Sequence, residues 1–203
     1  MRKEEAMRII EPCCYHKQLE GLIDECTQSQ KAAHFFSYSD WDIHQLLGLL
    51  SGYLQGGELY LALVRLDVKT ISTLRKLLNR IYPDPAQPQN HIPAITKMVL
   101  VTQPASAGAT FNQRAELREQ LGRFIQDGRL TVCEDNIGFR CIALRSCGKN
   151  LVIQGSLNLE QSGAMQMFTL TTSSEAYEEV AEMFQSKART KKIFKNSETP
   201  EKP

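Results

Sequence analysis

The feature of this sequence that most constrains its fold is the nearly continuous apolar run Glu58 to Leu66, with the sequence Glu-Leu-Tyr-Leu-Ala-Leu-Val-Arg-Leu. A strand with one solvated face alternates apolar and polar residues, so a run without that alternation predicts a strand buried on both faces of a sheet. Such a strand needs a covering layer on each side, which is typical of α/β domains. With 203 residues, 42% of them apolar, the chain is large enough to bury such a core.

Two further apolar runs, Ile95–Thr102 and Leu151–Gln154, predict additional central strands. Helical spacing of apolar residues predicts helices between the strands, beginning near Trp41, Val68, Asn112 and Ser174. The prolines between Pro83 and Pro93 predict a long irregular loop. Strands alternate with helices early in the chain and cluster later. We therefore expect a mixed, mostly buried β-sheet flanked by helices on both faces.

The domain organisation follows from the same patterns. Apolar residues between Glu11 and Cys26 recur at helical intervals and predict an N-terminal helical arm over residues 1–30. Residues 31–187 form the predicted α/β domain. Residues 188–203 form a basic tail, and the polar composition after Phe194 predicts that it is disordered.

One motif carries functional information. The apolar strand at Leu151 runs into Gly155-Ser156-Leu157-Asn158, a short loop and a further strand up to Leu170. This arrangement resembles the second half of the signature of the phospholipase D superfamily, Gly-Ser-x-Asn. The order strand, helix, strand, helix before it also resembles the N-terminal half of single-copy members, so the resemblance spans about residues 33–185. It implies a phospholipase D-like α/β fold.

The first half of that signature, His-x-Lys followed by an Asp, is missing. Counting back from Gly155, its positions hold Cys141, Ala143 and Gly148, and no histidine lies between residues 92 and 203. In the family, one histidine attacks phosphorus, a second protonates the leaving oxygen, and Lys with Asn stabilises charge on the phosphoryl oxygens. Single-copy members pair two signatures across a dimer, so one defective sequence removes both histidines.

The resemblance leaves a candidate phosphate site. Ser156 and Asn158 offer a hydroxyl and an amide donor, and Gln166, Lys149 and Arg140 lie near them in sequence. The alternatives are ordinary structural roles: a turn residue, a loop hydrogen bonder and a solvated strand residue. A pocket without the motif lysine also lacks its strongest charge-assisted contact with an anion.

A second candidate is the basic C-terminal region, a potential nucleic-acid contact. Its cations are Lys187, Arg189, Lys191, Lys192 and Lys195. Residues 187–203 hold six Lys or Arg and two Glu, a charge of +4, so the other 186 residues carry 18 minus 21, or −3. Any grip on phosphate backbones is therefore local. The alternative, which we favour, is a solvated helix end, where cations suit the helix dipole.

The cysteines offer weaker signals. Cys13, Cys14 and Cys26 with His16 provide four soft ligands, but the spacing matches no standard zinc finger, and we expect neither metal nor cofactor. Cys141 is a nucleophile only if a base such as His34, His44 or His91 reaches it; a buried thiol is the preferred interpretation. Because no export signal or membrane span is recognisable, we expect a cytoplasmic protein with reduced cysteines.

Three functional hypotheses remain open. The first is a non-catalytic phospholipase D-like protein, forming a homodimer, that binds nucleic acid or another phosphate-bearing ligand. The second is an active phosphodiesterase or nuclease with a displaced catalytic site. The third is a structural interaction subunit without a ligand.

Overall fold

The computed structural model describes residues 8–10, 15–29, 31–38, 43–63, 66–84, 86–87, 89–104, 107–136, 140–155 and 165–190. Side chains in this part are not described at residues 8–10, 15–17, 35–38, 43–45, 107–113 and 165–166. Among the described helices, none has the length and apolar character needed to cross a lipid bilayer.

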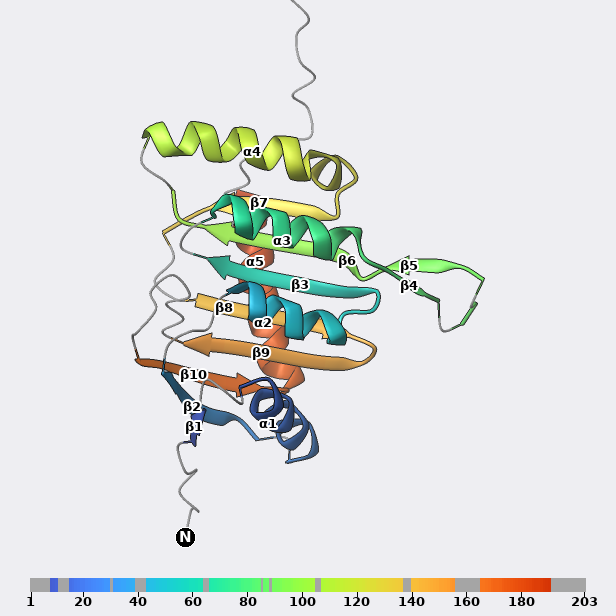
Figure 1. Cartoon of the computed structure of the whole chain (residues 1–203), viewed down its shortest axis with the longest axis vertical. Helices are drawn as coiled ribbons and strands as arrows, with labels where there is room; N and C mark the ends of the chain where they lie inside the picture. Colours follow the sequence, from blue (N-terminus) through green and yellow to red (C-terminus); the bar gives the residue numbers. More distant parts are fainter. Residues whose placement is uncertain are drawn as a thin grey trace, which may run out of the picture.

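The centre of the described structure is an eight-stranded mixed sheet with the order β1-β2-β10-β9-β8-β3-β6-β7 (Figure 1). The strands are β1 (Arg8–Ile10), β2 (Ala33–Tyr38), β3 (Gly57–Leu63), β6 (Ile95–Thr102), β7 (Leu130–Glu134), β8 (Arg140–Ser146), β9 (Lys149–Gly155) and β10 (Met165–Thr171). β3, β6 and β7 are parallel, whereas β8 is antiparallel to both β3 and β9. The three strands predicted to be central, β3, β6 and β9, all lie inside the sheet, which confirms that prediction.

Helices cover both faces of the sheet, as the sequence predicted (Figure 1). In the described part of the chain, one face carries α1 (Tyr15–Ser29), α2 (Ile43–Leu50), α3 (Val68–Asn79) and α4 (Ala107–Gln126), with the short 3-10 helix η1 (Ser51–Tyr53) after α2. The other face carries α5 (Ser174–Thr190). We call these the four-helix face and the α5 face.

Each face has its own core, because alternate residues of a strand point to opposite sides of a sheet. On the four-helix face, leucine and isoleucine side chains of β3, β6, β8 and β9 pack against helical leucines and Phe124. On the α5 face, Tyr60, Cys141 and Ala143 pack against Tyr177 and Phe184 of α5. The continuous apolar run of β3 is therefore explained by burial on two sides.

Local chemistry fixes the ends of elements. Asp67 caps α3, its side chain accepting a hydrogen bond from the backbone N–H of Thr70 at 2.6 Å. Gly57 begins β3 where a side chain has no room, since a Cβ there would lie 2.5 Å from the backbone oxygen of Arg145. Glycine at this position therefore allows β8 to approach β3 closely.

Two local predictions were wrong. The proline-containing stretch predicted as an irregular loop contains a hairpin, β4 (Ile81–Pro83) paired with β5 (His91–Pro93), which projects from the domain (Figure 1). Short strands of this kind carry too few residues for a periodic signal. The predicted N-terminal helical region includes the helix α1, but Arg8–Ile10 form β1, parallel to β2. The domain boundaries at residues 30 and 187 stay predictions.

Candidate functional site

The Gly-Ser-x-Asn motif begins at one edge of the sheet, which we call the motif edge. β9 ends there at Gly155, and β8 begins there at Arg140, its partner in register. β3, β6 and β7 run in the same direction as β9, so their carboxyl ends, at Leu63, Thr102 and Glu134, lie at the same edge. In open α/β sheets this is the edge where ligands usually bind.

Gly155 has a structural reason to be glycine. A Cβ at this position would lie 2.1 Å from the backbone oxygen of Met167 and 3.0 Å from the Cα of Phe168, both on the neighbouring strand β10. Any side chain would push the two strands apart. Close strand approach therefore accounts for the first residue of the motif independently of any ligand.

The donors predicted to bind phosphate are only partly placed. Ser156 and Asn158 lie outside the described residues. The backbone of Gln166 lies on β10 in register with Ser37 of β2, two strands from β8. The half-buried Arg140 faces Gly155 across the β8–β9 ladder and is the described cation nearest in register to the motif.

Lys149 lies at the other end of β9 from the motif. It is the first residue of the strand and Gly155 the last, so at about 3.3 Å per residue the two are about 20 Å apart. The structure therefore does not bring Lys149 together with the segment that starts at Ser156. Nearness in sequence was misleading here because the intervening residues are fully extended.

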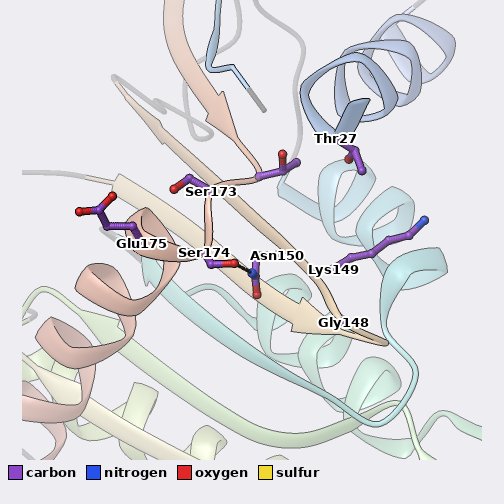
Figure 2. A pocket seen from close by; sticks show the side chains of 8 residues that line it. Thr27, Gly148, Lys149, Asn150, Ser173, Ser174 and Glu175 are labelled. Carbon is purple, nitrogen blue, oxygen red and sulfur yellow. Dashed lines mark hydrogen bonds between the residues drawn. The ribbon is translucent and has the colours of Figure 1, made fainter. Parts of the chain in front are cut away.

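Lys149 instead borders a polar pocket of about 410 Å³ where α1, the β8–β9 turn and the start of α5 meet (Figure 2). The pocket is lined by Thr27, Gly148, Lys149, Asn150, Thr172, Ser173, Ser174 and Glu175. Its hydroxyl groups already have partners within the chain. Thr27 donates to the Ile23 carbonyl at 2.7 Å and Thr172 to the Cys26 carbonyl at 3.0 Å.

The start of α5 beside this pocket is also satisfied internally. Ser173 Oγ accepts from the backbone N–H of Ala176 at 3.3 Å, which caps the helix. Asn150 donates its side-chain N–H to Ser174 Oγ at 2.8 Å, as the dashed line in Figure 2 marks. These bonds tie α5 to β9, and they explain the pocket as a junction between elements.

Cys141, which the motif resemblance aligns with the family's histidine, is fully buried beneath α5. Burial raises the pKa of its thiol to about 12, because the thiolate is poorly stabilised away from water. The thiol is thus protonated at neutral pH, and a protonated thiol is a poor nucleophile. Ala143, at the position of the family lysine, is buried on the same face.

No histidine in the described part of the chain lies next to Cys141. The register runs from Cys141 to Gln154, then Thr169, then His34, which places His34 three strands away, about 14 Å. His34 Nδ1 lies 3.0 Å from the hydroxyl of Thr169. His91 lies on the β4–β5 hairpin, at the opposite edge from the motif, and His44 lies on α2 on the four-helix face.

The C-terminal end of α5 reaches the motif edge. Lys187 forms an ion pair with Asp135, the residue after β7, while Arg189, the penultimate residue of α5, is exposed. A second ion pair joins Arg114 to Glu134 of β7 at 2.6 Å. Lys191, Lys192 and Lys195 lie outside the described residues. The basic region therefore begins at the motif edge, close to the end of β7.

The cysteines of the candidate zinc set are not placed together. Cys26 is buried, and its thiol donates to the Leu170 carbonyl at 3.8 Å. Cys13 and Cys14 lie outside the described residues, and no cluster of metal-binding side chains occurs among the described ones. The described contacts of Cys26 fit the predicted packing role.

Sequence reasoning missed a polar network on the α5 face. The Glu58 carboxylate accepts hydrogen bonds from the hydroxyls of Tyr60 at 2.9 Å and Tyr177 at 3.1 Å. Arg145 lies over the Tyr177 ring at 4.1 Å. Burial, then the nearby Tyr60 and Glu58, raise the pKa of Tyr177. Glu58 and Tyr177 are 119 positions apart in the sequence, so no local pattern predicts their contact.

Comparison with known proteins defines the fold and no more. No family model and no curated protein sequence matches the chain. Among solved structures, the polyphosphate kinase of Porphyromonas gingivalis matches with a TM-score of 0.52 and 16% identity, over 85% of this chain and 28% of the kinase. The chain has a phospholipase D-like α/β fold. This fold class is the one that the sequence predicted.

Two other solved structures match with TM-scores below 0.5. TrmBL2, described as an archaeal chromatin protein with a novel mode of DNA binding, has a TM-score of 0.48 and 11% identity, over 88% of this chain and 62% of that one. NucT from Helicobacter pylori has a TM-score of 0.47 and 11% identity, over 81% of this chain and 100% of that one. The chain thus spans less than two thirds of TrmBL2 and of the kinase.

Proposed function

We propose that this chain is a non-catalytic phospholipase D-like protein that binds the phosphate groups of nucleic acid at the motif edge. The observation that carries the first part is the state of the nucleophile position. Cys141 there is fully buried, with a thiol pKa raised to about 12, and Ala143 replaces the motif lysine. Neither residue supplies the nucleophile or the cation that phosphoryl transfer requires.

The second part rests on the cations at the same edge. Arg140 lies opposite Gly155, Arg189 is exposed near the end of α5, and the basic segment up to Lys195 follows it. Lys187, on the same helix, pairs with Asp135. Ser156 and Asn158 would add uncharged donors to a phosphate oxygen. Because residues 1–186 carry a net charge of −3 by sequence, such binding depends on cations gathered locally.

The homodimer stays part of the proposal. Single-copy relatives pair because their site lies between two copies, and an interface can outlast the chemistry it served. The proposal places the segment from Ser156 to Ala164 near the two-fold axis, so that each motif faces its copy. Sedimentation of the protein as a monomer across micromolar concentrations would remove this part.

The test compares two cations at the motif edge with one cation at the opposite edge of the sheet. Binding of a fluorescently labelled oligonucleotide is measured by anisotropy for the wild type, Arg140→Gln, Arg189→Gln and the control Lys149→Gln. We expect Arg140→Gln and Arg189→Gln, combined in one chain, to weaken oligonucleotide binding about tenfold. Binding by the wild type should also weaken as salt is added. Lys149→Gln is expected to change binding less than about twofold. Equal losses in all three variants, or no binding by the wild type, would reject a site at the motif edge.

Activity is tested on the same protein with bis-(p-nitrophenyl) phosphate, a generic phosphodiester. The proposal expects no turnover. Turnover that co-purifies with the protein and disappears in Cys141→Ser would overturn it and favour an active phosphodiesterase. Absence of both turnover and oligonucleotide binding would favour a structural interaction subunit.

A further inference from the structure

A second basic feature lies on the four-helix face, away from the motif. A pocket of about 430 Å³ opens between α3 and α4, and its lining is Arg75, Glu119, Gln120 and Arg123. α3 and α4 lie side by side on this face of the sheet (Figure 1). The two arginines thus come from different helices and border one cavity.

Burial of the neighbouring residues fixes both arginines at the surface. On α3, Leu74 and Leu78 are buried against the sheet, which leaves Arg75 exposed. On α4, Leu121 and Phe124 are buried, which leaves Arg123 exposed. Arg75 directly follows Leu74, and Arg123 directly precedes Phe124. Neighbouring residues on a helix point in different directions, so each arginine is turned away from the buried side chain beside it.

The two guanidinium groups differ from three other described arginines, which each pair with a carboxylate. Arg114, Arg129 and Arg145 each pair with an Asp or Glu within 3.3 Å. Among the described ion pairs, none includes Arg75 or Arg123. Arg123 lies over the ring of Phe124 at 4.5 Å, a contact that leaves its N–H groups available.

The other two lining residues, Glu119 and Gln120, set the net charge of the pocket together with the arginines. Gln120 donates its side-chain N–H to Glu116, so its carbonyl oxygen remains for other contacts. Glu119 is the one carboxylate in the lining, which therefore sums to two positive charges and one negative, or +1. A net positive pocket with two planar forks of N–H donors suits a small oxyanion.

We propose that the α3–α4 pocket binds a phosphate group, chelated by Arg75 and Arg123. Guanidinium groups match phosphate oxygens with two parallel hydrogen bonds each, and two such groups from separate helices hold the anion from two sides. The phosphate belongs either to a small phosphorylated molecule or to a nucleic-acid backbone. This inference is independent of the proposed function, because the pocket shares no residue with the motif edge.

The experiment measures binding of inorganic pyrophosphate by isothermal titration calorimetry to the full chain and its variants. Arg75→Gln combined with Arg123→Gln is expected to weaken binding at least about tenfold, by loss of both charge-assisted contacts. Lys76→Gln is the matched control. Lys76 is exposed on the same helix, next to Arg75, but does not line the pocket, and its loss should change affinity less than about twofold. Glu119→Gln is expected to tighten binding, since it removes the competing carboxylate.

A labelled oligonucleotide forms the second arm. If the double variant loses affinity for both probes, the nucleic-acid backbone is the source of the phosphate; loss for pyrophosphate alone assigns a small phosphorylated ligand. Absence of pyrophosphate binding by the wild type, or an equal loss in Lys76→Gln, would overturn the proposal.

Discussion

The two faces of the sheet are covered in different ways. The four-helix face is closed by leucine, isoleucine and phenylalanine side chains from four helices. The α5 face has one helix in the described part of the chain, and it buries two tyrosines and two cysteines beside a carboxylate. Cys141 and Ala143, which the motif resemblance aligns with the family's histidine and lysine, lie on the α5 face. The four-helix face is thus an apolar core, whereas the α5 face combines apolar packing with a network of polar side chains.

The largest expected effect comes from the four-helix face. Leu74 is fully buried there, so Leu74→Ala should lower the free energy of unfolding by about 2–5 kcal/mol through lost packing and a cavity. Urea denaturation followed by circular dichroism measures the change. Lys76→Ala, exposed on the same helix, is the control and should stay within about 0.5 kcal/mol. A loss below about 1 kcal/mol for Leu74→Ala would contradict the packing assigned to this face.

On the α5 face, Glu58→Ala should lower the free energy of unfolding by about 1–3 kcal/mol, because it leaves the hydroxyls of Tyr60 and Tyr177 without their acceptor. Glu58→Gln keeps an acceptor oxygen and should cost less. A double-mutant cycle with Tyr177→Phe measures the coupling. Additive effects of the two substitutions would show that the network contributes nothing as a unit.

Stability should also depend on pH through Cys141. Its pKa is raised to about 12 in the folded chain, whereas the unfolded thiol ionises near its ordinary value. The contribution is therefore fully present below the unfolded pKa and is lost as the pH rises towards the folded one. Between about pH 8 and about pH 10 the free energy of unfolding should fall by about 1–2 kcal/mol from this thiol.

Cys141→Ala isolates this effect from those of other titrating groups. The variant should show a shallower decrease of stability with rising pH than the wild type, measured by urea denaturation across the same range. Identical slopes for the two proteins would mean that Cys141 is not held as a buried, protonated thiol.

The smallest effect is expected at Lys149, the first residue of β9, beside the β8–β9 turn. Lys149 is exposed there, and its ammonium group takes part in none of the described ion pairs, so Lys149→Gln should change the free energy of unfolding by less than about 0.5 kcal/mol. Thermal unfolding measures it. A larger loss would show that the polar pocket at the start of α5 needs its cation.

The layered arrangement of this protein follows from patterns that are visible in its sequence. Continuous apolar runs predicted β3, β6 and β9 as central strands, and helical spacing predicted the principal helices. Both predictions work because the spacing of apolar residues along an element reflects which of its sides are buried. The motif count also predicted that Cys141 and Ala143 occupy the positions of the family's histidine and lysine. The structure buries both residues beneath α5.

Contacts between residues that are distant in sequence follow from the tertiary structure alone. Lys149 and Gly155 are close in sequence but lie at opposite ends of a strand, while Glu58 and Tyr177 are distant in sequence and form a hydrogen bond. Arg75 and Arg123 likewise reach one pocket from two helices. These contacts depend on strand register and helix packing, which involve residues far apart in the chain. Local sequence patterns indicate whether a residue is buried. Which distant residue it contacts depends on how the strands and helices are assembled.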